Sequence, residues 1–149
     1  MEQHFVKYIY EFFKRLIEIY GFHKRKELNE GQSYMIEFSS SNFVIRIEKY
    51  FREFYALLYK ESKQDYQINL FNLLEYLVQD DEKVPKSNYF RNENENDICY
   101  KKQIDHISSV LYKHYRLIDN FFNENNYELK VKEFERYWKG KHPEFYNRV

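Results

Sequence analysis

The chain has 149 residues, and its 24 basic and 24 acidic side chains leave no net charge at neutral pH. Nucleic-acid-binding proteins usually carry a clear basic excess, because contacts with phosphates supply much of their affinity, so this balance argues against a nucleic-acid partner. The chain holds three glycines and none of the glycine-rich motifs that bind dinucleotides or phosphates or that position the nucleophile of α/β-hydrolases.

The first part of the chain reads as a helix followed by strands. Apolar residues recur at the helical period over residues 2–20, and Gly21 stands where a left-handed helix cap is favoured. From Phe22 onward the apolar period changes to two, which predicts an antiparallel meander with short polar links. The expected strands are Phe22–Leu28, Ser33–Ser39, Phe43–Tyr50 and Glu53–Tyr59, of which the last also has helical spacing.

Helices dominate the second half of the sequence. Asn69 can cap the first of them, the second is expected to bend near Ser108 and Ser109, and Gly140 and Pro143 are expected to end the third. The expected helices are Leu70–Gln79, Asp97–Phe122 and Tyr127–Trp138. A chain of this length suits one domain, so we expect residues 1–149 to form a single α+β domain. It would consist of an N-terminal helix, an antiparallel meander of about four strands, and three helices packed on one sheet face.

Residue types that carry catalysis are few and scattered. The single cysteine, Cys99, begins the long helix between apolar neighbours and is expected to be a small buried residue. His106 and His114 stand two helical turns apart, which is too far for a pair of metal ligands, and we expect both on the exterior of the helix. We therefore predict no catalytic residue, no metal site and no cofactor, and an enzyme is the less favoured interpretation.

The predicted sheet offers a charged cluster and a superficial likeness to an RNA-binding strand. Glu37 and Glu48 could face the same side near Arg46, which predicts a solvent-exposed charge network across the strands. The segment 42–51 places aromatic and basic residues on a strand, but it lacks the glycines of RNA-recognition motifs and its charges nearly balance. Nucleic-acid binding is therefore not predicted.

The location of the protein is inferred from segments that the sequence lacks. One cysteine excludes an intrachain disulfide and fits a reducing compartment. The first residues do not form a basic segment followed by an apolar run, and the apolar stretches are much shorter than a membrane span. We expect a cytoplasmic protein that does not bind membranes.

The long irregular segment from Asp80 to Glu95 is the part of the sequence most typical of a binding loop. Loops of this length are usually functional or partly disordered, and a solvated connector is the alternative. Its acidic residues could attract a basic partner, and its Tyr and Arg are types enriched at interface centres. The residues predicted to bind a partner are Asp80, Asp81, Glu82, Tyr89, Phe90 and Arg91.

The order of the elements resembles a group of known proteins. A helix ends at Tyr20-Gly21-Phe22, a meander follows, and the segments 68–74 and 117–122 come next. This pattern is similar to small uncharacterised bacterial α+β proteins, some of which look like immunity proteins of polymorphic-toxin systems. The resemblance carries no functional residue. It implies a cytoplasmic protein that neutralises a toxin by tight protein–protein binding.

Two hypotheses about function follow. The first is a non-enzymatic protein-binding domain whose partner is another protein, with a toxin as the candidate. The alternative is a small enzyme or a ligand-binding domain with a Tyr-lined pocket between sheet and helices. Either a monomer or a homodimer is compatible with the sequence, because the first strand of a meander can pair with its twin.

Overall fold

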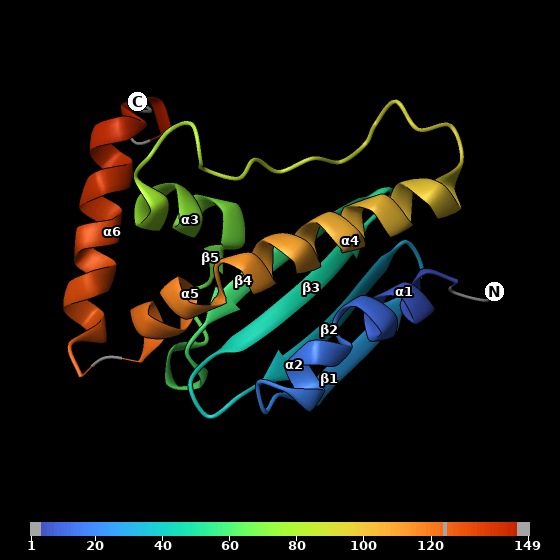
Figure 1. The fold of residues 1–149 in the computed structure, drawn as a ribbon, viewed down its shortest axis with the longest axis horizontal. Helices are drawn as coiled ribbons and strands as arrows, with labels where there is room; N and C mark the ends of the chain where they lie inside the picture. The colour runs from blue at the N-terminus through green and yellow to red at the C-terminus, as the bar shows by residue number, and fades with distance from the viewer. Residues whose placement is uncertain (1–3, 124, 146–149) are drawn as a thin grey trace.

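The computed structural model describes residues 4–123 and 125–145, and it confirms the α+β fold (Figure 1). Five antiparallel strands form one sheet in the order β1-β2-β3-β4-β5, and α1, α2 and α4 cover one of its faces. The strands are β1 His23–Glu30, β2 Ser33–Ser39, β3 Val44–Tyr50, β4 Glu53–Tyr59 and β5 Ile68–Asn69. The helices are α1 Phe5–Phe12, α2 Lys14–Glu18, α3 Leu70–Val78, α4 Asn96–Lys113, α5 Tyr115–Phe122 and α6 Tyr127–Lys141, with short 3-10 turns η1 Glu61–Lys63 and η2 Pro143–Phe145.

The meander follows the alternation of the sequence closely. The bounds of β2 and β4 are those expected, and the helical alternative for β4 is wrong. β1 runs two residues further than expected, because it pairs along β2 up to a tight turn at Gly31, whose φ of 65° suits glycine. The fifth strand was not expected, since its two residues, paired with Leu57 and Leu58, are too few to show a period.

The N-terminal helix is interrupted, contrary to expectation. The backbone leaves helical geometry at Phe13, with φ −98° and ψ 7°, and α2 begins at the next residue. The ring of Phe13 is 1% exposed and stacks on Phe38 of the sheet, with ring centroids 6.1 Å apart. Gly21 has the predicted left-handed conformation, and the N–H of Phe22 closes the cap by donating to the Leu16 carbonyl. Residues 2 and 3 of the predicted helix lie outside the described residues.

The long helix breaks at His114 rather than bending near Ser108 and Ser109. The Ser108 hydroxyl donates to the Asp105 carbonyl, 3.0 Å away, and the helix continues past it. At His114 the backbone has φ −109° and ψ 15°, and α5 starts at Tyr115. The break turns the chain so that three apolar side chains of α5 enter the core, namely Ile118, Phe121 and Phe122.

The remaining helix boundaries depend on local chemistry. The predicted cap at Asn69 is confirmed, because its side-chain oxygen accepts from the N–H groups of Phe71 and Asn72. Gly140 does not end α6 as expected. A glycine within a helix costs about 1 kcal/mol without stopping it, and the helix ends at Lys141, just before Pro143.

The core lies between the helices and one face of the sheet. Each central strand directs alternate side chains inward, and α4 crosses the strands diagonally above them (Figure 1). The helix α6 packs on α3 and α5 at one end of this layer. The sheet residues of the core are Ile36, Phe38, Ile45, Ile47, Phe54, Ala56 and Leu58, none of them more than 2% exposed.

Candidate interaction surface

The sheet face opposite the core is termed the open face, because none of the described α-helices covers it. Directly opposite residues of antiparallel neighbours share a face, so one row crosses the sheet through Leu28, Met35, Glu48 and Tyr55. A second row, nearer the hairpin tips, contains Tyr50 and the residues directly opposite it, Ser33 of β2 and Glu53 of β4. The open face consists of Lys26, Leu28, Glu30, Ser33, Met35, Glu37, Ser39, Val44, Arg46, Glu48, Tyr50, Glu53, Tyr55, Leu57 and Tyr59.

A buried carboxylate organises the interior of the open face. The Glu37 carboxylate accepts from Arg46 Nε at 2.9 Å and from the Tyr59 hydroxyl at 2.6 Å. Arg25 of β1 lies 3.6 Å from the same carboxylate and 3.3 Å from Glu61 of η1. Burial, followed by the bond to Glu37, raises the pKa of Tyr59 to about 12. The network ties β1, β2, β3, β4 and η1 together.

The sequence foresaw the members of this network but not its burial. Arg46 lies close to Glu37 and Glu48, as predicted, and its Nη1 is 3.2 Å from the Glu48 carboxylate. The expectation of a solvent-exposed network is wrong for Glu37, which is 1% exposed because Arg25, Arg46 and Tyr59 surround it. The side chain of Glu48 retains 36% of its exposure.

Two exposed aromatic residues lie at the tip of the β3–β4 hairpin, Tyr50 at the end of β3 and Phe51 in the turn that follows. Tyr50 is 60% exposed and Phe51 is 53% exposed, and their rings meet edge to face with centroids 4.6 Å apart. Phe51 has a φ of 55°, a left-handed conformation in which a bulky residue is strained and which Asn or Gly adopts far more readily. The tip therefore holds an apolar residue where neither burial nor backbone geometry calls for one.

The predicted binding loop is attached to the fold at several points, although most of its residues are exposed. It runs beside α4 (Figure 1), and its far end is fixed where Arg52 donates to the Glu93 carbonyl at 2.6 Å. The thiol of Cys99 lies 3.4 Å from the Tyr89 carbonyl oxygen, and Lys102 pairs with the Glu93 carboxylate at 2.8 Å. Cys99 is 1% exposed, as expected of a small buried residue.

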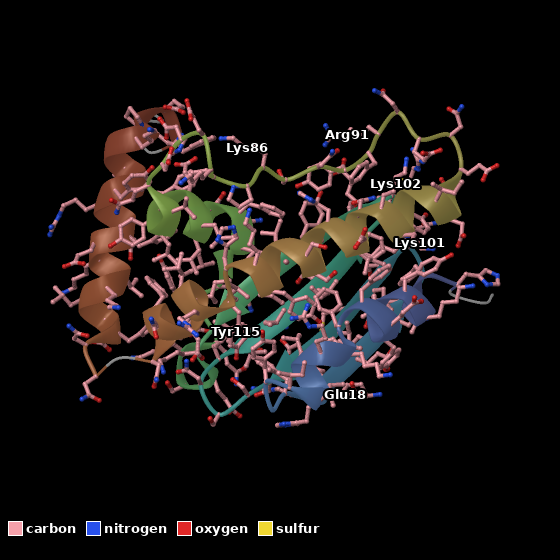
Figure 2. All side chains as sticks on the ribbon, viewed as in Figure 1. Glu18, Lys86, Arg91, Lys101, Lys102 and Tyr115 are labelled. Atoms are coloured by element: carbon pink, nitrogen blue, oxygen red, sulfur yellow. The ribbon has the colours of Figure 1, made fainter. Side chains whose placement is uncertain are left out.

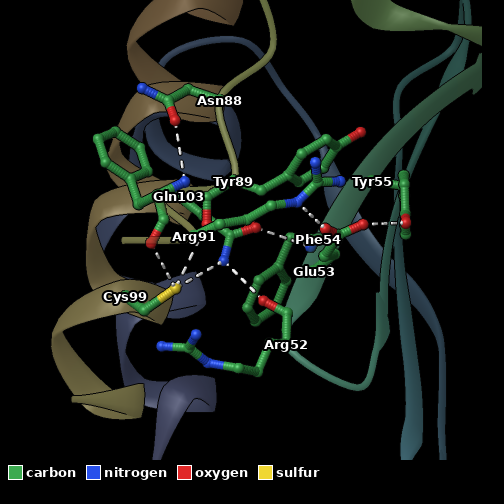
Figure 3. Close-up of polar contacts among 10 residues, drawn as sticks. Arg52, Glu53, Phe54, Tyr55, Asn88, Tyr89, Arg91, Cys99 and Gln103 are labelled. Atoms are coloured by element: carbon green, nitrogen blue, oxygen red, sulfur yellow. Dashed lines mark hydrogen bonds and ion pairs between the residues drawn. The ribbon is translucent and has the colours of Figure 1, made fainter. Parts of the chain in front are cut away.

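Gln103 joins α4 to the start of β4, and the sequence analysis missed it. Its side-chain oxygen accepts from the N–H of Phe54 at 2.9 Å, and its amide nitrogen donates to the Arg52 carbonyl at 2.7 Å (Figure 3). Gln103 is 1% exposed, one helical turn after Cys99 and one before Ile107. An amide inside that buried stripe was the available signal, because a buried polar group must find partners.

Tyr89 and Arg91 extend the open face beyond β4. The Arg91 guanidinium donates to the Glu53 carboxylate at 2.6 Å and lies 4.9 Å from the Tyr89 ring centroid (Figure 3). Tyr89 in turn packs on Tyr55, with centroids 5.6 Å apart. Arg91 and then Tyr55 lower the pKa of Glu53 through hydrogen bonds. The sequence placed Tyr89 and Arg91 in the loop, and the structure places both beside the sheet.

Phe90 points the other way, onto α4. Its backbone has a φ of 49°, and its ring contacts His106 at 6.3 Å, while the Lys102 ammonium lies 5.9 Å from the ring. His106 also stacks on Phe71 of α3, with its Nε2 2.7 Å from the Lys86 carbonyl oxygen. The expectation that His106 covers the helix exterior is therefore wrong, since α3 and the loop pack against it.

The acidic residues stand apart from the aromatic ones. Asp80, Asp81 and Glu82 are exposed just after α3, where Asp81 lies 3.8 Å from Lys141 of α6. Along the rest of the loop the labelled side chains in Figure 2 are basic, with Lys86 ahead of Arg91. The structure thus divides the six predicted residues into an acidic group, an open-face pair and a residue packed on α4.

Lys49 is a buried cation that the sequence analysis did not single out. It follows Ile45 and Ile47 on the core side of β3 and is 8% exposed. Its ammonium lies 5.2 Å from the ring centroid of Phe5 and 4.9 Å from that of Tyr100. Burial lowers its pKa. The contacts attach α1 and α4 to the same end of β3 through cation–π attraction.

Metal binding and membrane insertion each require particular features of residues 4–123 and 125–145. These residues contain no group of three or more His, Cys, Asp or Glu side chains that could hold a metal ion. None of their helices has the length and apolar character to cross a membrane. A depression between β4, α3, α4 and the loop, lined in part by Phe54 and Phe71, has a volume of about 10 Å³, too small for a substrate.

No family model, no curated protein and no solved structure matches this chain.

Proposed function

We propose that the chain is a non-enzymatic protein-binding domain and that it binds its partner through the open face together with Tyr89 and Arg91. The observation that carries the proposal is the exposed pair at the β3–β4 tip. The backbone of Phe51 is strained in its left-handed conformation, and its exposed ring gains little stability from burial. Folding therefore gives no reason for a phenylalanine at this position. Contact with another molecule supplies such a reason.

The composition of the surface supports the same proposal. Tyr and Arg are enriched among residues that dominate binding energy, and Tyr50, Tyr55, Tyr89 and Arg91 lie on or beside the sheet. The hydrogen bonds from Arg91 and Tyr55 to Glu53 hold this region in place before any partner arrives. Pre-ordered side chains reduce the entropy that binding must overcome.

A toxin-neutralising role in the cytoplasm is the specific form of the proposal. Inhibition of this kind requires a rigid complementary surface and no chemistry. The exposed Asp80, Asp81 and Glu82 would attract and orient a basic partner, as toxins that cleave nucleic acids often are. A partner of this class would be harmful when expressed alone and harmless when expressed together with this chain.

The test begins with capture of partners by the tagged chain from its native host and identification by mass spectrometry. The decisive variant is Phe51→Asn, because Asn relieves the backbone strain while removing the ring. We expect unchanged or slightly higher stability and about tenfold or more loss of affinity for the captured partner.

The matched control is Leu129→Asn, since Leu129 is a comparably exposed apolar residue on α6, 51% against 53% for Phe51. It should leave the affinity unchanged. Equal affinities for wild type and Phe51→Asn would overturn the proposed surface. A partner whose affinity falls only when Asp80, Asp81 and Glu82 are neutralised would move the binding site to the end of α3.

A second candidate function, small-ligand binding, is favoured by one observation. A mainly apolar groove lies between the segment after β4 and α6, lined in part by Lys63, Tyr66, Tyr127 and Val131. The buried hydroxyl of Tyr127 has no hydrogen-bond partner among the described residues. A thermal-shift screen of small aromatic acids and amides tests this function. Stabilisation of wild type that is lost in Tyr127→Phe would support it.

A further inference from the structure

β1 is an open edge of the sheet. It pairs with β2 on one side, and among the described strands it has no neighbour on the other. Seven of its eight residues are exposed, and Leu28 retains 43% of its exposure. The irregularity in its pairing lies between Lys24 and Lys26, so the stretch from Lys26 to Glu30 is regular. An edge strand with a regular stretch of this length has unpaired N–H and C=O groups that can accept another strand.

The regular part of β1 is complementary to itself. Lys26, Leu28 and Glu30 point to the open face, with the apolar residue in the middle and opposite charges on either side. Neither Lys26 nor Glu30 forms an ion pair with another residue of the described chain. Beside Leu28, the half-buried Met35 of β2 continues the apolar strip.

We propose that two copies of this chain associate through antiparallel pairing of their β1 edges, with Leu28 opposite Leu28 on the two-fold axis. This register places Lys26 of each copy opposite Glu30 of the other, which gives two reciprocal ion pairs. The two sheets become one sheet of ten strands, with both sets of helices on the same side and the two open faces continuous.

Neighbouring registers are less favourable. If the open faces of the two copies are to lie on the same side, the two-fold axis must be perpendicular to the sheet and must lie midway between the two copies of one residue. Centring on Lys26 or on Glu27 would place like charges opposite each other, and centring on Asn29 would place Leu28 opposite Glu30. Only the Leu28 register of these four avoids like charges and matches apolar with apolar.

The proposal is independent of the partner surface at Tyr50 and Phe51, and the test uses charge reversal. Light scattering after gel filtration, over a concentration series, should show wild type moving from 18.8 kDa towards twice that mass. Lys26→Glu and Glu30→Lys should each weaken association about tenfold, because each creates two like-charged pairs. The double variant, with the charges exchanged, should regain association.

The sharpest version mixes the two single variants. Lys26→Glu carries two acids and Glu30→Lys two bases at these positions, so each should be monomeric alone and the pair should form a heterodimer. Lys113→Glu, an exposed reversal on α4, should leave association unchanged. The proposal would be overturned if wild type stayed at 18.8 kDa at every concentration. It would also be overturned if the two single variants and the double variant all dimerised as wild type does.

Discussion

The two faces of this sheet are built from alternate residues of the same strands, yet they differ in almost every property. On the covered face, Ile36, Ile47 and Leu58 are fully buried between strands and helices. On the open face, Tyr50 is 60% exposed, while the Glu37 carboxylate and the Tyr59 side chain that donates to it are both 1% exposed. The covered face is held by apolar packing, whereas the open face is held by a charge network that leaves Tyr and Arg side chains accessible.

The residues of the covered face stabilise the fold, whereas those at the rim of the open face are available for binding. A side chain of the covered face contributes to stability through burial, and its removal leaves a cavity. A side chain at the rim of the open face contributes little to stability, so its identity is free to follow the needs of a partner. Substitutions on the two faces should therefore separate stability from binding.

The largest effect is expected on the covered face. Phe38→Ala removes a fully buried ring that stacks on Phe13 and should lower the free energy of unfolding by about 3–5 kcal/mol. Tyr50→Ala on the open face should change it by less than about 0.5 kcal/mol. Denaturant titration of both variants measures the difference. Similar losses of unfolding free energy for the two variants would contradict the view that the covered face stabilises the fold and the rim of the open face does not.

A smaller but clear loss is expected at the centre of the open face. Glu37→Gln leaves Arg46 and Arg25 without their buried counter-charge and should cost about 3 kcal/mol. Glu48→Gln, whose side chain is 36% exposed, should cost less than about 1 kcal/mol. The same titration tests both variants. If Glu37→Gln lowered the free energy of unfolding no more than Glu48→Gln does, the network would not stabilise the fold, and this prediction would be wrong.

The smallest effect is a pH dependence at Tyr59. Its hydroxyl donates to the Glu37 carboxylate, a bond worth about 1.5 kcal/mol, which Tyr59→Phe would remove. Because the pKa of Tyr59 rises from 10.0 to about 12 in the folded chain, this stabilisation is complete below pH 10 and is lost as pH rises through 12.

The measurement is the free energy of unfolding of wild type and Tyr59→Phe from neutral pH to pH 12. The gap between them should be constant up to about pH 10 and close above it. A gap that stays constant to pH 12 would mean that the pKa of Tyr59 is the same in the folded and the unfolded chain, which would contradict this prediction.

The sequence was sufficient for features that depend on neighbouring residues. Alternation located β2 and β4, and Asn69 announced the start of α3, because period and capping are local properties. The sequence also predicted that Arg46 lies near Glu37, because the short link between two neighbouring strands of a meander limits how they can be aligned. The breaks at Phe13 and His114 were missed, because they arise from packing against distant elements.

The candidate surface could be predicted only in part for the same reason. The loop was recognised from its length and composition, and Tyr89 and Arg91 were named within it. Their alignment with Tyr55 and Glu53 depends on contacts between residues more than thirty positions apart. No periodic pattern records such contacts, and the same holds for the bonds that Gln103 makes to β4.

The central claim is that the open face, with its exposed hairpin tip, meets the partner. Hydroxyl-radical footprinting of the captured complex tests it directly, because exposed aromatic and aliphatic side chains are oxidised in the free chain. The account predicts that binding protects Tyr50, Phe51 and Tyr89, while Ile19, exposed after α2, and Leu129, exposed on α6, react as before. Protection of Ile19 or Leu129 with unchanged oxidation of Tyr50 and Phe51 would contradict it.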